Sequence, residues 1–234
     1  MLNKSVFTRI ILFAVCIAAV SLSAAGQDRT SPAMLGKAIQ EITLPQYQGG
    51  TFSVSGLKGK NVLLVFPRGL AGKDHWCHIC NYQYAEFVEL EKKKKIRKKY
   101  NLEIAFVFPY AKEVIDNWLD TFPSQMKEIE SWKHGKDANP QYKAFALEYL
   151  PKKFSYEKGK IPMPFPVLID SDQKVSNQLG LYRTEWSGSK IEQNVPTVIL
   201  IDKKGIVRFK YFSQNTLDRP SPEYILNFLD KMIK

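Results

Sequence analysis

Two cysteines, Cys77 and Cys80, are separated by two residues in the segment Trp-Cys-His-Ile-Cys that begins at Trp76. Thiols at this spacing can close into a disulfide and open again, so one pair can accept and release two electrons. An apolar segment precedes the pair and an amphipathic one follows it, which puts Cys77 at the expected start of a helix. Because a helix amino terminus stabilises a thiolate, the pattern indicates thiol redox chemistry.

The same cysteines allow other roles. A structural disulfide would close a very short loop and would restrain little of the unfolded chain. Haem attachment needs a histidine directly after the second cysteine, and residue 81 is asparagine. His75 and His78 leave metal binding open: one short segment cannot easily surround a tetrahedral zinc ion, although two sulfurs could hold copper(I). We expect redox chemistry, with no metal and no other cofactor.

The amino-terminal segment indicates the compartment. Residues 1–9 contain Lys4 and Arg9 and no acidic residue, residues 10–20 are uncharged and mostly apolar, and small residues permit cleavage after Ala25. This is the layout of a secretory signal peptide over residues 1–25, so we expect a periplasmic or otherwise extracytoplasmic protein that loses Cys16 with the signal. An uncleaved membrane anchor is the alternative, since the uncharged stretch is at the short limit for spanning a bilayer.

The chain is basic, with a formal net charge of +11 among 234 residues. Such a balance raises the question of nucleic acid or an anionic membrane as a partner. Much of the excess lies in the lysine-rich run of residues 92–99, at the end of the helix expected after Cys77, where positive charge complements the helix dipole. Without interleaved aromatic residues, we interpret this run as a solvated helix end. We expect no nucleic acid partner, and membrane contact only through an uncleaved signal.

After the signal, we expect a flexible linker over residues 26–39 and one α/β domain over residues 40–234. A hairpin is expected over residues 42–55, followed by a strand over 61–66 whose continuous apolar run is typical of burial on both faces. The further elements expected in this half are a helix from 77 to about 99, a strand over 102–108 and a helix over 111–122. Their alternation favours right-handed crossovers and a parallel core.

Residues 123–163 interrupt this alternation. They contain too many large apolar residues for a disordered linker, so we expect a mostly helical insertion packed on the core. The regular pattern then returns. The remaining expected elements are strands over 165–170, 197–202 and 206–212, the last one antiparallel, and helices over 175–179 and 222–233. The predicted fold is a central mixed sheet flanked by helices.

Four segments together resemble one family. They are residues 57–66, the Trp-Cys-x-x-Cys of residues 76–80, the Pro-Val-Leu-Ile-Asp of residues 166–170 and the Val-Pro-Thr strand start within residues 195–205. The chain resembles thioredoxin-fold proteins of the redoxin branch, which includes the alkyl hydroperoxide reductase/thiol-specific antioxidant family and the cell-envelope thiol-disulfide reductases. The resemblance covers about residues 40–122 and 164–233, and not the insertion.

The resemblance implies a role for each matching residue. Cys77 is the exposed nucleophile and Cys80 the more buried resolving thiol. Pro196 matches a proline that follows a cis peptide bond, faces the two sulfurs and leaves backbone groups free to pair with a substrate. The supporting positions are Trp76, His78 and Thr197.

The chain also departs from the family pattern. His78 and Ile79 stand between the cysteines, where relatives often have proline; His78 could favour the thiolate when protonated, or could be an exposed helix histidine. The first buried strand carries no acidic residue, which leaves the proton acceptor for Cys80 unidentified. The loop of residues 67–75 is longer than in most reductases, and we interpret its Asp74 and His75 as loop polar groups rather than proton carriers.

We therefore expect an exported thiol-disulfide oxidoreductase that reduces or exchanges protein disulfides and receives electrons from an upstream thiol donor. A peroxiredoxin-like peroxidase with Cys77 as the peroxidatic cysteine is the main alternative. Its Pro-x-x-x-Thr-x-x-Cys motif fails, since Leu70 and Asp74 occupy the two motif positions, and Pro196 stands where the catalytic arginine is expected, although Arg68 could substitute. A redox-inert thioredoxin-like binding module and a copper-transfer protein are further alternatives.

Overall fold

The computed structural model describes residues 33–73 and 75–232. The expected signal peptide, with Cys16, and the first part of the expected linker lie outside these residues, as does Asp74. Among the residues described, no helix combines the length and the apolar composition needed to cross a membrane.

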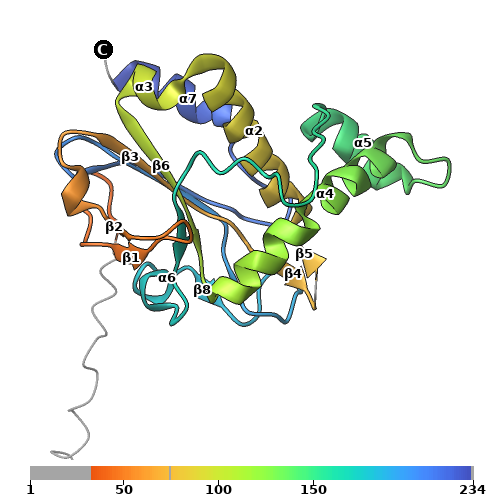
Figure 1. Cartoon of the computed structure of the whole chain (residues 1–234), viewed down its shortest axis with the longest axis horizontal. Helices are drawn as coiled ribbons and strands as arrows, with labels where there is room; N and C mark the ends of the chain where they lie inside the picture. The colour runs from red at the N-terminus through yellow and green to blue at the C-terminus, as the bar shows by residue number, and fades with distance from the viewer. Residues whose placement is uncertain (1–32, 74, 233–234) are drawn as a thin grey trace, which may run out of the picture. The chain divides into compact units, whose positions relative to one another are not determined.

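A five-stranded mixed sheet organises the fold (Figure 1). Its strand order is β11-β10-β3-β6-β7. The strands are β3 (Asn61–Phe66), β6 (Leu102–Phe108), β7 (Val167–Ile169), β10 (Thr197–Ile201) and β11 (Val207–Phe212). β3, β6 and β7 are parallel, whereas β10 runs antiparallel to β3 and β11 antiparallel to β10. The α/β fold with a mixed sheet predicted from the sequence is confirmed.

Three helices cover one face of the sheet: α2 (His78–Lys94), α4 (Lys112–His134) and α7 (Pro222–Met232). Alternate residues of β3, such as Leu63 and Val65, point into the core beneath these helices. Because the side chains of a strand alternate between faces, their neighbours enter a second core on the opposite face.

The opposite face is covered by an amino-terminal hairpin and a short helix. The hairpin pairs β1 (Thr43–Pro45) with β2 (Thr51–Ser53) and continues into a 3-10 turn, η1 (Ser55–Leu57). The helix α6 (Lys174–Gln178) packs Val175 against the same core. The continuous apolar run of β3 is thus explained by burial on both faces.

The chain before the hairpin is tied to β11. The backbone N–H groups of Gly36 and Ile39 donate to the carbonyls of Val207 and Gly205, and Val207 N–H donates to Lys37. The flexible linker expected over residues 26–39 is therefore wrong for residues 36–39, because these backbone groups are hydrogen bonded to β11 and to the turn that precedes it.

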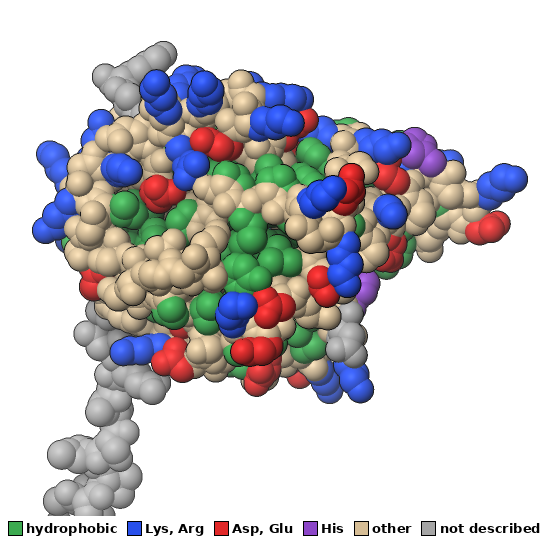
Figure 2. Space-filling view, viewed as in Figure 1, with side chains coloured by type: hydrophobic (Ala, Val, Ile, Leu, Met, Phe, Trp, Pro, Cys, Tyr) green, Lys and Arg blue, Asp and Glu red, His purple; other side chains and the backbone are tan. Residues whose placement is uncertain are grey.

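The helix expected to reach Lys99 is interrupted. Lys95 adopts a left-handed conformation (φ 48°) that ends α2, and α3 (Ile96–Tyr100) begins directly after it. The reorientation buries Ile96 and Tyr100, which offsets the cost of a left-handed lysine. The lysines of residues 92–95 are exposed, as expected of a solvated helix end. Figure 2 shows lysine and arginine side chains gathered along the edge where α3 lies in Figure 1.

The helix expected to end at Phe122 continues through Pro123 to His134. Its apolar stripe runs on through Met126 and Ile129 into the core, and this packing outweighs the backbone hydrogen bond that Pro123 cannot donate. A second helix, α5 (Pro140–Tyr149), follows. Residues 123–163 are thus largely helical, but their first helix is shared with the core.

The register of the sheet fixes where a site can form. Phe66, the last residue of β3, is paired with Thr197, the first of β10, and Thr197 is paired with Phe212, the last of β11. One edge therefore carries the segment that leads to Cys77, the Pro-Thr start of β10, and the loop of residues 213–221.

Candidate active site

Cys77 caps the amino terminus of α2 from an extended conformation (φ −69°, ψ 105°). Its own N–H donates to the carbonyl of Gly69 (2.9 Å), and its Sγ accepts from the N–H of Cys80 (3.4 Å). Both cysteines are free thiols. The helix therefore places one sulfur at its positive end and the other one turn later.

Both sulfurs are enclosed. Cys77 is 5% exposed and Cys80 4% exposed, so the exposed Cys77 expected from the sequence is wrong. The reason is the loop of residues 213–221, which brings Thr216 and Leu217 to the cavity beside Cys77 and Arg219 to the sulfurs themselves. Cys77 still faces this cavity, whereas Cys80 accepts a backbone hydrogen bond from Arg68 N (3.3 Å).

Arg219 is a residue of the site that no sequence pattern identified. Its Nη2 lies 3.4 Å from Cys80 Sγ and 3.7 Å from Cys77 Sγ. Its Nη1 donates to Ser213 Oγ (3.2 Å) and to the carbonyl of Asp218 (2.5 Å), while its Nε is buried without a hydrogen-bond partner. A guanidinium held in this way supplies a fixed positive charge to both sulfurs.

The two thiols titrate as one unit around this charge. The hydrogen bond that Cys77 gives to Cys80, together with burial, raises the pKa of Cys77. Burial also acts to raise the pKa of Cys80, yet that pKa is lowered because the Cys77 hydrogen bond, the charge of Arg219 and the Arg68 amide stabilise the thiolate. These opposite directions favour a single thiolate on Cys80, beside Arg219, while Cys77 keeps its proton.

His78 does not supply that charge. It is 4% exposed, so the exposed helix histidine considered from the sequence is wrong. Its Nε2 lies 2.8 Å from Glu128 Oε2, and its ring packs on Trp132 (4.7 Å) and His75 (4.9 Å). Burial lowers the pKa of His78 in spite of Glu128. A neutral imidazole cannot favour the Cys77 thiolate by its charge.

Pro196 lies at the sheet edge that carries the site, but not as the resemblance implied. The described residues contain no cis peptide bond, so the Val195–Pro196 bond is trans. The neighbouring backbone is already paired: Val195 N–H donates to Leu181, Ser213 N–H donates to Pro196, and Thr197 Oγ1 donates to Val195. The free backbone groups expected for a substrate are therefore occupied within the chain. Thr197 acts by closing this turn.

Trp76 fixes the entrance to α2. It lies in the short strand β5 (His75–Trp76), paired with β4 (Leu70–Gly72), and is fully buried. Its Nε1 donates to Asn117 Oδ1 (2.9 Å), and its ring meets Tyr110 edge to face (5.7 Å). This contact holds the cysteine segment against α4.

The loop between β3 and β4 is fixed by two contacts. Gly69 (φ 80°) packs so closely on Tyr110 that a side chain there would overlap the ring. The Arg68 guanidinium donates from Nε to Gln193 Oε1 (2.6 Å) in β9 (Gln193–Asn194), which pairs with β8 (Tyr182–Arg183). The loop thus holds both the Gly69 carbonyl behind Cys77 and the Arg68 amide behind Cys80.

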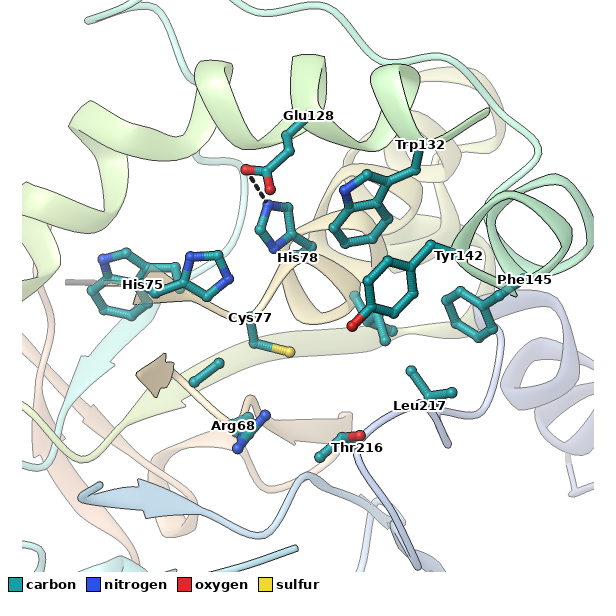
Figure 3. A pocket seen from close by; sticks show the side chains of 13 residues that line it. Arg68, His75, Cys77, His78, Glu128, Trp132, Tyr142, Phe145, Thr216 and Leu217 are labelled. Carbon is teal, nitrogen blue, oxygen red and sulfur yellow. Dashed lines mark hydrogen bonds and ion pairs between the residues drawn. The ribbon is translucent and has the colours of Figure 1, made fainter. Parts of the chain in front are cut away.

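A cavity of about 340 Å³ opens beside Cys77 (Figure 3). The Cys77 sulfur points into it, with Arg68 and Thr216 on one side and the His78–Glu128 pair on another. Tyr142 and other apolar side chains complete its wall. Such a cavity admits a substrate of modest size to one sulfur of the pair.

The residues that the structure describes include no cluster of three or more His, Cys, Asp or Glu side chains able to hold a metal ion. His75 and His78 do stack on each other beside Cys77. The Arg219 cation contacts both sulfurs and would oppose the approach of a metal cation.

The model of the AhpC/TSA family matches residues 35–210, more than half of the chain. The chain belongs to the AhpC/TSA family. No curated protein matches it in sequence.

Solved peroxiredoxin structures share the fold of this AhpC/TSA-family chain. The reduced 2-Cys peroxiredoxin of Plasmodium vivax is similar with a TM-score of 0.55 and 17% identity, over 86% of this chain and 83% of that one. A cysteine-to-serine variant of peroxiredoxin 6 from Arenicola marina gives a TM-score of 0.56 and 11% identity, over 86% and 73% of the two chains. At these identities, the likeness shows the fold alone.

Within the AhpC/TSA frame, this chain assembles its site from distant segments. Leu70, which occupies the proline position of the peroxidase motif, lies in β4, and Asp74, which occupies the threonine position, is outside the described residues. Thr216 and Arg219 come instead from the loop after β11, more than 130 residues later in the chain. The site therefore combines a pair of thiols, a fixed cation and a cavity, which the family's thiol oxidoreductase chemistry can use.

Proposed function

We propose that this chain is a thiol-disulfide oxidoreductase whose redox centre is the pair Cys77 and Cys80. The observation that carries the proposal is the shared contact of Arg219 with both sulfurs, while only Cys77 opens to the cavity. A cation stabilises the thiolate that attacks a disulfide and the thiolate that leaves it. Protein disulfides are the proposed substrates, and an upstream thiol is the proposed electron donor.

The reaction follows from the position of each sulfur. In the resting pair Cys77 keeps its proton and Cys80 carries the thiolate. When Cys77, the sulfur that faces the cavity, reacts, its proton passes to Cys80 along the hydrogen bond between them. Cys77 attacks one sulfur of the substrate disulfide, and the other sulfur leaves as a thiolate. Cys80 then loses its proton and attacks Cys77, which releases the second substrate thiol. Two electrons pass to the substrate, and the enzyme is left with a Cys77–Cys80 disulfide.

A glutathione redox titration of the purified chain tests the proposal. We expect one two-electron transition that disappears in both Cys77→Ser and Cys80→Ser. We also expect the reduced Cys80→Ser variant to attack the disulfides of insulin or of a cystine peptide and to accumulate a mixed disulfide through Cys77, and Cys77→Ser to form none. Thiols that never cycle in this titration would instead support a redox-inert binding module.

Peroxide reduction is the second candidate, and Arg219 is the observation that favours it. A guanidinium beside the attacking sulfur can polarise the O–O bond, and Thr216 lines the same cavity. Cys77 would take one oxygen from the peroxide to form a sulfenic acid and release an alcohol or water; Cys80 would then condense with it, releasing water and forming the disulfide. Rapid peroxide consumption that is lost in Cys77→Ser, without insulin reduction, would establish this candidate over the first.

We further propose that the chain works outside the cytoplasm, on the basis of the signal-like composition of residues 1–25. A full-length chain with a carboxy-terminal tag, expressed in a Gram-negative host, is expected in the periplasmic fraction, with a mass that corresponds to cleavage after Ala25. Retention in the cytoplasm at full mass would contradict this proposal and leave the redox proposal unchanged.

A further inference from the structure

The wall of the cavity opposite the Cys77 sulfur is apolar and aromatic. It combines the start of α2, the end of α4, the helix α5 and the loop after β11 (Figure 3). Its apolar side chains are Ile79, Trp132, Tyr142, Phe145 and Leu217.

Part of this wall is open to solvent without being needed for the core. Tyr142 is 56% exposed and Leu217 49% exposed. Tyr142 lies nearly parallel to Trp132, with ring centroids 5.6 Å apart, so the exposed ring is held in place. Exposed apolar side chains that are grouped and oriented beside a reactive thiol mark a binding surface rather than an ordinary solvent-facing surface.

The surface continues beyond the first cavity. A second cavity, of about 110 Å³, shares Ile79, Phe145 and Leu217 with the first and extends toward Tyr149 and Pro220. The two cavities together make a groove that runs past Cys77 along α5, with a mainly apolar lining and the polar side chains of Gln83, Glu86 and Arg219 in its second part. A groove of this kind suits an extended chain better than a single small thiol, whose atoms would fill only one cavity.

The burial of the sulfur restricts the substrate further. With Cys77 5% exposed, a disulfide on the surface of a rigid folded domain cannot reach the sulfur. A flexible segment can enter the cavity, and the side chain next to its cysteine then lies against the aromatic wall. The polar side chains of Arg68 and Thr216 line the same cavity beside that segment.

We propose that this groove selects flexible disulfide-bonded polypeptides with an aromatic or branched aliphatic residue beside the reacting cysteine. The inference rests on the proposed thiol-disulfide exchange and names its substrate class. The chemistry is that of the proposed reaction: the Cys77–substrate disulfide forms, the substrate S–S bond breaks, and Cys80 releases the bound peptide as a thiol. Tyr142 and Leu217 are specificity-determining residues in this assignment.

The test uses the reduced full chain and two probes, the symmetric disulfides of N-acetyl-Phe-Cys-amide and N-acetyl-Ser-Cys-amide. Single-turnover rate constants are measured by acid quench and chromatography. We expect the Phe peptide to react at least tenfold faster, since burial of one aromatic ring in an apolar site is worth that factor or more. Tyr142→Ala and Leu217→Ala are expected to remove most of this preference, because each slows the Phe peptide more than the Ser peptide.

Leu147→Ala is the matched control, because Leu147 is an exposed apolar residue of α5 that lines neither cavity. We expect it to change neither rate. Two results would overturn the proposed role of the groove while leaving disulfide exchange intact. They are equal rates for the two peptides in the wild-type chain, and equal losses of rate with both peptides in Tyr142→Ala. A wild-type chain that reduces neither peptide would overturn the proposed function and the groove together.

Discussion

The Arg219 guanidinium lies 3.4 Å from Cys80 Sγ, although 139 residues separate the two in the chain. The loop that carries Arg219 follows β11, whose last residue is paired with the first residue of β10, beside the end of β3. The cation and the cysteine pair therefore approach from two segments at one edge of the sheet. The stability of the thiolate therefore depends on the tertiary fold, which brings Arg219 to the sulfurs, as well as on the helix terminus.

Replacement of Arg219 by methionine is expected to disfavour the thiolate. The variant loses the charge and the hydrogen bonds that lower the pKa of Cys80, while burial, which acts to raise it, remains. Thiolate absorbance at 240 nm is expected to appear at higher pH, and iodoacetamide alkylation at pH 6 to slow roughly tenfold. Arg183→Met, at an exposed arginine of β8, serves as the control. An unchanged alkylation profile in Arg219→Met would show that the helix terminus alone stabilises the thiolate.

Replacement of Gly69 by alanine is expected to destabilise the chain more than replacement of Gly159. Both glycines have positive φ, 80° and 74°, so both variants incur the left-handed penalty of about 1 to 2 kcal/mol. Only the Gly69 methyl group would overlap the Tyr110 ring, whereas a methyl group at Gly159 meets nothing within 4 Å. We expect a further loss of about 1 to 3 kcal/mol for Gly69→Ala in urea unfolding. Equal losses in the free energy of unfolding of the two variants would mean that the loop around Gly69 shifts to accommodate the added methyl group.

Most of the secondary structure could be predicted because hydrophobic periodicity is a local signal. The strands Asn61–Phe66 and Leu102–Phe108 have the bounds expected from their apolar runs. The helix ends were missed where packing overrode local rules. Burial of Ile96 required a break at Lys95, and the apolar stripe of α4 continued through Pro123.

The site was less predictable because its parts meet only in three dimensions. The Cys-x-x-Cys spacing identified the two thiols, but no local pattern marks Arg219 or Thr216. The one available signal was topological: an antiparallel strand over residues 206–212 must end at the sheet edge where the cysteine segment begins. The buried state of His78 was equally hidden, since its partner Glu128 lies on another helix, 50 residues away.

The free energy of unfolding is expected to fall as the pH drops below about 6.5. Burial lowers the pKa of His78 in the folded chain below the ordinary value of 6.5, despite the neighbouring Glu128. The unfolded chain therefore takes up the imidazole proton first, so the contribution is complete above pH 6.5 and declines as the pH falls toward the folded pKa. One proton gives a slope of at most about 1.4 kcal/mol per pH unit.

Urea unfolding between pH 5 and pH 8 measures this slope. His78→Gln is expected to flatten the profile in the window below pH 6.5, and His134→Gln, at an exposed histidine of α4, is expected to leave it unchanged. A wild-type slope that survives in His78→Gln would assign the titration to another group.

A buried polar network joins α2 to α4 one turn after Cys77. Trp118 Nε1 donates to Asn81 Oδ1 (2.7 Å), Asn81 Nδ2 donates to Gln125 Oε1, and Asn81 N–H donates to the carbonyl of Cys77 (3.1 Å). Asn81→Leu leaves the Trp118 N–H and the Gln125 carbonyl buried without a partner. We expect a loss of about 2 to 4 kcal/mol in the free energy of unfolding, because each orphaned group costs about 1 to 3 kcal/mol.

The double variant Asn81→Leu/Trp118→Phe separates the polar contribution from packing. Trp118→Phe removes the donor that Asn81→Leu orphans, so the two losses are expected to be less than additive by about 1 kcal/mol or more. Urea unfolding of the wild type, the two single variants and the double variant gives the coupling energy, and a redox titration of each chain reports whether the side-chain network affects the disulfide. Strictly additive losses would show that Asn81 and Trp118 contribute through shape alone, since the hydrogen bond between them would then carry no coupling energy.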